Sequence, residues 1–266
     1  MATNKIYLSA TSIKTYLSCK KRFKYKYLDK IDIGKTISNK YISFGNSMHM
    51  TLADYNMITD ESYKTLDILH DLLRKNWIRE GYSSIKEEKE YGQMGLELLT
   101  QYYKNPKDIG SKNLIIEQMI YKEMDHYILC GKLDKVYIRK DGIVEVLDYK
   151  TGKTIYPIDK IQLPVYLILA KEKLGYFPKS VSLYYLYENK KITKDLTDDL
   201  IEKATEFIYK LCDHICTETN FKATPNSYCN SNCEYYKICE DTKNHNLIVL
   251  NSLEEFKSKN KLNTVF

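Results

Sequence analysis

The sequence lacks any run of apolar residues long enough to span a membrane, and no cleavable secretion signal opens it. We therefore expect a cytoplasmic protein. Apolar residues make up 43% and charged residues 29% of the 266 residues, fractions typical of a soluble globular protein. A chain of this length can form one sizeable core, which predicts a single domain with insertions rather than two independent domains.

The cysteine content argues against a disulfide framework. There are seven cysteines, an odd number in a chain expected to stay in the cytoplasm, and this favours a metal or cluster site. The formal net charge is a modest +6, which permits DNA binding without proving it. The 25 tyrosines could stack on single-stranded DNA, but we attribute most of them to the codons of an AT-biased genome.

A β-hairpin followed by a helix organises the chain. Two β-rich runs, 127–139 and 143–149, flank the turn signal Lys140-Asp141-Gly142. A two-residue turn would place Asp134 opposite Tyr149. A three-residue turn closed by Gly142 in the left-handed conformation places Asp134 opposite Asp148, and this is the register that we predict. Strand alternation then puts Lys150 on the same face as the two carboxylates.

Facing carboxylates repel each other unless a cation lies between them. Oxygen ligands of this kind suit Mg²⁺ or Mn²⁺, and a lysine beside the metal can orient a water or stabilise charge on a phosphoryl oxygen. An ordinary surface hairpin with an Asp–Lys pair is the alternative for Asp148 and Lys150 taken alone.

Two predicted helices carry further polar candidates. A helix that starts near Asp159 places Gln162 and Tyr166 on one face, four residues apart, with Pro164 in the first turn. His49 is expected early on another helix, where a lone histidine is more often structural than a ligand.

Three motifs together resemble the catalytic core of the PD-(D/E)XK nuclease superfamily. They are Gly131-Lys-Leu-Asp134, Asp148-Tyr-Lys150 and Gln162-Leu-Pro-Val-Tyr166. The RecB-like branch, which includes the AddB nuclease domain and CRISPR-associated iron–sulfur exonucleases, is the most similar group. The resemblance implies an α/β fold, in which a mixed central sheet is flanked by helices.

The same resemblance assigns roles to the motif residues. It implies that Asp134 and Asp148 bind the metal, that Lys150 is catalytic, and that Gln162 and Tyr166 position the substrate. Gly45-Asn-Ser-Met-His49 has the spacing with which the branch supplies a metal-binding imidazole, so His49 is the expected third ligand. Glu117 resembles an acidic residue that often precedes the hairpin, although solvent-facing alternation on a strand explains it equally well.

Three cysteines, Cys229, Cys233 and Cys239, lie close together after Pro225. With Cys19 they supply four thiolates, the ligand count of a 4Fe–4S cluster or of zinc. The RecB-like iron–sulfur nucleases likewise have one cysteine before the core and three after it, so the resemblance implies a 4Fe–4S cluster, with zinc as the alternative. The first pair departs from the usual spacing by one residue.

The remaining cysteines and basic residues have competing interpretations. Cys212 and Cys216 could form a zinc half-site, but we interpret them and Cys130 as structural. The stripe 20–27 alternates basic and aromatic residues and is either a DNA-contacting edge or a solvated helix face.

The predicted nuclease domain spans residues 1–240. It includes a helical insertion over about 60–107, whose helices are connected by 81–90, and strands at 114–121 and 181–188. An amphipathic helix follows over 196–216. Residues 241–266 are predicted to be a tail with a short helix at 254–257.

The sequence thus predicts a metal-dependent DNA nuclease, and the resemblance favours an exonuclease. Its partners would be DNA that is single-stranded or has free ends and, as in family members, a helicase of recombination and repair or CRISPR integration machinery. Two alternatives stay open: a non-catalytic DNA-binding subunit on a nuclease fold, and a regulator stapled by zinc.

Overall fold

The computed structural model describes residues 5–34, 39–225, 229 and 232–240. The tail predicted for 241–266, including its short helix, lies outside these residues. Within the described part, no helix combines the length and apolar character needed to cross a membrane.

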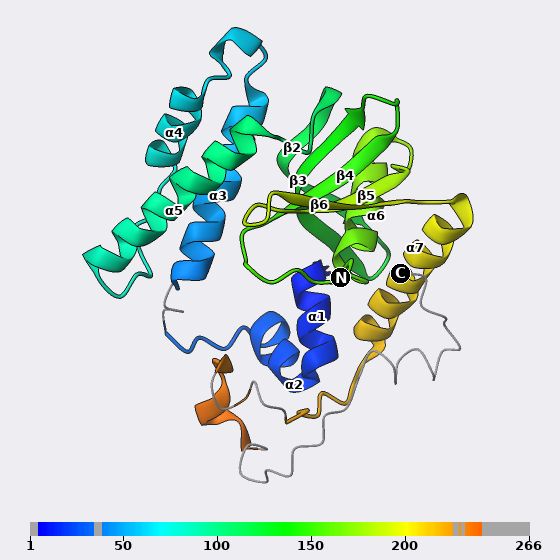
Figure 1. Cartoon of the computed structure of the whole chain (residues 1–266). Coiled ribbons are helices and arrows are strands. Elements are labelled where there is room, and N and C mark those ends of the chain that lie inside the picture. Colours follow the sequence, from blue (N-terminus) through cyan, green and yellow to red (C-terminus); the bar gives the residue numbers. More distant parts are fainter. Residues whose placement is uncertain (1–4, 35–38, 226–228, 230–231, 241–266) are drawn as a thin grey trace.

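A mixed sheet forms the centre of the molecule (Figure 1). Its strands run in the order β1-β3-β4-β5-β6, in which β1 and β4 pair with different ends of one edge of β3. Strand β2 pairs with the opposite edge of β3. Two pairs are parallel, β1 with β3 and β4 with β5, and the other pairs are antiparallel. The strands are β1 (Ile6–Leu8), β2 (Gly110–Glu123), β3 (Tyr127–Arg139), β4 (Val144–Lys150), β5 (Ser180–Tyr185) and β6 (Lys190–Asp195).

The hairpin register is the one predicted. Arg139 and Ile143 close a three-residue turn through a backbone hydrogen bond of 2.8 Å, and Gly142 adopts a φ of 85°. The paired residues of β3 and β4 end at Lys135 opposite Leu147. The next residue on each strand is Asp134 and Asp148, so the two acids face each other as expected.

Helices cover the sheet in two groups that form separate cores (Figure 1). The first group packs on residues such as Val146 and Leu183, and the second packs on the alternate residues Leu147 and Tyr184. Because neighbours on a strand point to opposite faces, the two groups lie on opposite faces of the sheet. The first group is α1 (Ala10–Ser18), α6 (Gln162–Leu174) and α7 (Asp198–Thr217), and the second is α3 (Lys40–Met57), α4 (Leu66–Lys75) and α5 (Ile85–Lys104).

Several local predictions were wrong. Strands β1 and β6 were not anticipated, since β1 has only three residues and β6 reads Lys-Lys-Ile-Thr-Lys-Asp, without apolar alternation. Helix α5 begins at Ile85, inside the segment predicted as a connection, because Ser84 caps its first turn. His49 lies in the middle of α3 rather than early on it, because the helix is capped by Asn39.

The basic and aromatic stripe after α1 is largely occupied by contacts within the chain. It forms α2 (Lys20–Phe23) and a π-helical segment, η1 (Lys24–Leu28). Phe23 is fully buried, and four basic residues form ion pairs with acidic residues: Lys20 with Glu218, Arg22 and Lys26 with Glu234, and Lys24 with Asp29. These contacts favour the structural interpretation over a DNA-contacting edge.

Candidate active site

The two hairpin acids lie at the point where β3 and β4 stop pairing. Asp134 and Asp148 are both buried, with exposed fractions of 6% and 2%. The carboxylate of Asp134 accepts a hydrogen bond of 2.8 Å from the backbone N–H of Tyr149. This bond replaces the strand-to-strand hydrogen bond that the Tyr149 N–H would make if the pairing of β4 with β3 continued. It also fixes the orientation of Asp134 beside Asp148.

His49 and Glu117 bring two further ligand types to Asp134. Nδ1 of His49 lies 3.2 Å from Oδ2 of Asp134. One ligand atom from each of His49, Glu117 and Asp134 can be chosen so that all three lie within 4.8 Å of one another. Helix α3 delivers the imidazole, whereas the two carboxylates come from β2 and β3.

Asp148 lies outside that group of three and contacts the other predicted residues. Nζ of Lys150 is 2.5 Å from Oδ2 of Asp148, and Nε2 of Gln162 donates a hydrogen bond of 2.6 Å to Oδ1. Lys150 also donates to Oε1 of Gln162 at 3.1 Å, and Gln162 donates to the hydroxyl of Tyr166 at 2.9 Å. The structure therefore joins Asp148 and Lys150 to the first two turns of α6.

Close packing between β3 and α6 depends on Gly131, the first residue of the Gly-x-x-Asp motif. A Cβ atom at this position would lie 2.9 Å from Leu169 Cδ1 and 3.5 Å from the ring of Tyr166. A larger residue would require the end of the Leu169 side chain to shift and would crowd the ring of Tyr166. The glycine thus allows Tyr166 and Gln162 to lie beside the hairpin acids.

The protonation equilibria of the site reflect its excess of negative charge. Burial lowers the pKa of His49, but the charge and hydrogen bond of Asp134, with smaller effects of Asp148 and Glu117, raise it to about 9. Burial and the charge of Asp134 raise the pKa of Asp148 to about 6, although Lys150 opposes this shift. Three carboxylates around one imidazole favour the binding of a cation.

Glu117 is the site residue for which the sequence left two interpretations open, a supporting role implied by the resemblance and a solvent-facing position on a strand. It lies between the pairs Ile116–Lys135 and Gln118–Leu133, so its place on β2 is opposite Asp134. Its φ is +45°, a left-handed conformation that is strained for a glutamate within a strand. Alternation alone gave no hint of this, because it predicted a solvent-facing side chain whereas the structure turns Glu117 toward His49.

The donor set fits a hard divalent cation. It consists of carboxylate oxygens and one imidazole, which are ligands of Mn²⁺ and, for the oxygens, of Mg²⁺. Among the described residues, Asp148 Oδ2 and Glu117 Oε1 are buried oxygens, and each lies in ion-pair contact with a lysine, Lys150 and Lys132 respectively. These contacts show that both oxygens favour a neighbouring positive charge.

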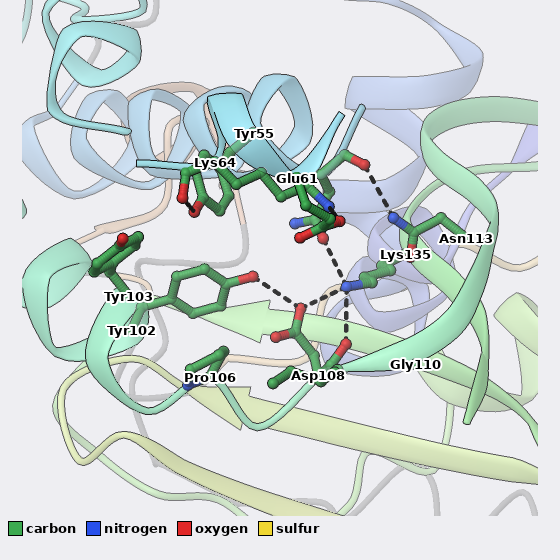
Figure 2. Close-up of a pocket in the computed structure, with 12 residues that line it drawn as sticks. Tyr55, Glu61, Lys64, Tyr102, Tyr103, Pro106, Asp108, Gly110, Asn113 and Lys135 are labelled. Carbon is green, nitrogen blue, oxygen red and sulfur yellow. Dashed lines mark hydrogen bonds and ion pairs between the residues drawn. The ribbon is translucent and has the colours of Figure 1, made fainter. Parts of the chain in front are cut away.

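A buried ion pair between Lys135 and Asp108, drawn in Figure 2, lies on the sheet face opposite that of Asp134, the neighbour of Lys135 on β3. Nζ of Lys135 contacts Asp108 Oδ2 at 2.7 Å, the Asp108 backbone oxygen at 3.0 Å and Asn56 Oδ1 at 2.7 Å. Asp108 also accepts hydrogen bonds from the hydroxyls of Tyr102 and Tyr149. The pair lines a cavity of about 250 Å³ and links α3, which carries His49, to the strands that carry the acids.

Two of the four predicted cluster cysteines, Cys19 and Cys233, lie in segments that contact each other. Cys19 caps α2, and its Sγ accepts from the backbone N–H groups of Arg22 and Thr224, each at 3.5 Å. Arg22 forms an ion pair of 2.9 Å with Glu234, the residue after Cys233. The rings of Tyr25 and Tyr235 are 5.5 Å apart. The segment of Cys233 therefore lies beside the helices that follow Cys19.

Two of the other cysteines, Cys212 and Cys216, are packed as apolar residues. Cys212 is fully buried in the core beneath the sheet, and Cys216 packs against that core. Burial raises the pKa of both thiols, to about 11 for Cys216. This packing supports the structural interpretation of the two thiols.

A hairpin with two facing acids and a lysine, next to a helix with a Gln-x-x-x-Tyr motif, defines a nuclease-like core. A family model described as the PD-(D/E)XK nuclease superfamily matches residues 7–240. The chain belongs to this superfamily.

The proteins that are similar to this chain include one curated protein and one solved structure. One is a protein of Carboxydothermus hydrogenoformans named as a subunit of an ATP-dependent helicase/deoxyribonuclease, which is 21% identical over 244 residues, covering 76% of this chain and 22% of that protein. The chain thus spans less than a quarter of the length of this relative. The solved structure of a proposed exonuclease from Eubacterium rectale has a TM-score of 0.48 and 13% sequence identity, covering 93% of this chain and 90% of the other.

Proposed function

We propose that this chain is a deoxyribonuclease that hydrolyses phosphodiester bonds with Mg²⁺ or Mn²⁺. The observation that carries the proposal is the grouping of His49, Glu117 and Asp134 beside Asp148 and Lys150. His49, Asp134 and Asp148 would hold the metal, with Glu117 as an additional ligand. When bound, the ion would lower the pKa of a water and neutralise charge in the transition state.

The remaining site residues would orient the attacking water and position the DNA strand. Lys150, held between Asp148 and Gln162, is placed to orient the attacking water or to stabilise charge on a phosphoryl oxygen. Gln162 fixes Lys150 and Asp148 through separate atoms, and Tyr166 fixes the amide of Gln162. These two residues would position the DNA strand and keep the lysine in place.

DNA is the substrate that we propose, because the name of the relative from Carboxydothermus hydrogenoformans includes a deoxyribonuclease. The name also includes a helicase, which supports a role with a helicase in recombination or repair. We further propose that residues 1–240 form one nuclease domain that acts on DNA ends, and that Cys19, Cys229, Cys233 and Cys239 hold a 4Fe–4S cluster. Contacts between the segments of Cys19 and Cys233 support the cluster.

A cleavage assay tests the function. We expect the protein to degrade end-labelled linear DNA with Mn²⁺ and to leave closed circular DNA intact. Asp148→Asn and Lys150→Met should each lower the cleavage rate roughly a hundredfold or more, because the first weakens a proposed metal ligand and the second removes the cation placed to stabilise charge on the phosphoryl oxygen. Binding of the same DNA, measured by fluorescence anisotropy, should change little.

Matched controls come from the same hairpin. Asp141→Asn and Lys140→Met alter exposed residues of the turn and should cleave at the parental rate. Cleavage by Asp148→Asn or Lys150→Met at that rate would refute the assignment. A parental protein that binds DNA but cuts none with either ion would instead be the non-catalytic subunit.

A further inference from the structure

One part of the sheet carries large side chains that the described residues leave exposed. Tyr7 on β1 is 57% exposed, and Met119 and Tyr121 on β2 are 47% and 56% exposed. Their strand neighbours Leu8, Ile120 and Leu129 are buried in the core below α6. Because side chains alternate across a strand, the three exposed residues share the face that points away from α6.

The strand pairing makes these residues one continuous surface. Across β3, Tyr7 is paired with Ile128, Tyr121 with Cys130, and Met119 with Lys132. The rings of Tyr7 and Tyr121 meet edge to face, with centroids 6.4 Å apart. We call this surface the tyrosine face, and it comprises Tyr7, Met119, Tyr121, Ile128, Cys130 and Lys132.

The tyrosine face leads directly to the candidate active site. Lys132, whose side chain is 48% exposed, forms an ion pair with Glu117. Glu117 in turn belongs to the group with His49 and Asp134. Along β2, Met119 and Tyr121 follow Glu117 by two and four residues, which corresponds to about 7 and 13 Å at the usual rise of a strand. Two exposed side chains, Met119 and Tyr121, therefore extend along β2 away from Glu117, and Tyr7 lies beside Tyr121.

We propose that the tyrosine face binds the bases of single-stranded DNA next to the bond that is cut. Exposed aromatic rings stack on unpaired bases of any sequence, whereas the bases of a duplex are already stacked on each other. Lys132 supplies a positive charge for the backbone at the end nearest the acids. The inference rests on the proposed nuclease function and specifies its substrate as a strand that is single near the site.

Binding of an unpaired strand tests the proposal. A fluorescein-labelled oligo-dT is titrated with the whole chain in EDTA, so that no cleavage occurs, and anisotropy is recorded. Tyr7→Ala and Tyr121→Ala should each raise the dissociation constant about fivefold or more, and the double variant should raise it further. Tyr121→Phe keeps the ring and should bind as the parental protein does.

Two controls make the result specific. Tyr176, which is 49% exposed beyond the far end of α6, is the matched tyrosine, and Tyr176→Ala should leave binding unchanged. Binding of a blunt duplex should change less than twofold in all variants. In the unaltered protein, an oligonucleotide with 5-bromodeoxyuridine should crosslink under light to peptides that contain Tyr7 or Tyr121. This measurement does not depend on the folding of any variant.

Other outcomes would overturn the proposal. Parental binding by Tyr7→Ala/Tyr121→Ala, or crosslinks confined to other peptides, would show that the DNA takes another path. If that double variant instead changes the oligomeric state in sedimentation, the tyrosine face is an interface between copies of the chain. Either result leaves the nuclease assignment standing, provided that Asp148→Asn still abolishes cleavage in the parallel assay.

Discussion

At the scale of single residues, the site is determined by how Asp134 is held. Its carboxylate accepts the Tyr149 N–H and contacts the His49 imidazole, so that one acid connects the hairpin to α3. The sequence identified Asp134, Asp148, Lys150 and His49, and the structure brings them together. For Glu117 the sequence could not decide between a supporting role and a solvent-facing position, because its left-handed φ reverses the direction that strand alternation predicts.

The histidine gives the metal-free protein a defined pH dependence. Burial opposes protonation, but the surrounding carboxylates raise the pKa of His49 to about 9, above its usual value near 6.5. The stabilisation from the charged imidazole is therefore complete below about pH 6.5 and is lost as the pH rises through 9. In EDTA, urea denaturation should show the free energy of unfolding falling over this interval.

His49→Gln provides the comparison. Glutamine does not titrate, so the fall between about pH 6.5 and 9 should largely disappear in this variant. The titration of Asp148 does not affect this comparison, because its pKa of about 6 lies below the pH interval that is compared. Equal pH slopes for the parental protein and His49→Gln would show that the imidazole is not charged in the fold.

At the scale of elements, the hairpin and α6 could be predicted because their signals are local. Gly142 fixes the three-residue turn, and the turn fixes which residues face each other. The support on the reverse face could not be predicted. Asp108 and Lys135 are separated by 27 positions, and Asp108 lies in a connection before β2 where an acid suggests nothing special.

We predict that Lys135→Met destabilises the fold strongly. The substitution leaves Asp108 buried without its cation, a change that typically costs about 3–5 kcal/mol of unfolding free energy. Both side chains are nearly inaccessible, at 4% and 1% exposure, so solvent cannot compensate. Thermal or urea unfolding followed by circular dichroism measures the loss.

Lys64→Met is the matched control, since Lys64 lines the same cavity. Lys64 pairs with Glu61, which is 80% exposed, so its loss should cost less than about 1 kcal/mol. Similar losses for Lys135→Met and Lys64→Met would indicate that the buried pair does not anchor α3 to the sheet.

At the scale of the whole molecule, the N-terminal helices and the C-terminal cysteine segment lie side by side. Glu234 joins both Arg22 and Lys26, and Glu218 accepts from Tyr16 and pairs with Lys20. The sequence predicted this association from cysteine spacing and family resemblance. The individual ion pairs could not be predicted, because their partners are about two hundred residues apart.

A shared cluster would stabilise that association. Protein purified without oxygen should contain iron and sulfide and should show the visible charge-transfer absorption of an iron–sulfur cluster. Cys19→Ser and Cys233→Ser should lose the absorption and unfold at lower temperature, because the staple between distant segments is removed. Cys130→Ser should keep both. A colourless protein that contains zinc would contradict the iron–sulfur assignment.

The convergence of His49, Asp134 and Asp148 on one divalent ion is tested most directly by Mn²⁺ titration followed by electron paramagnetic resonance. The measured signal comes from free Mn²⁺, so it decreases as Mn²⁺ binds to the protein. We predict saturable binding by the parental protein and by Asp141→Asn, and binding at least tenfold weaker by Asp134→Asn and by His49→Gln. Equal affinities in all four proteins would contradict the account.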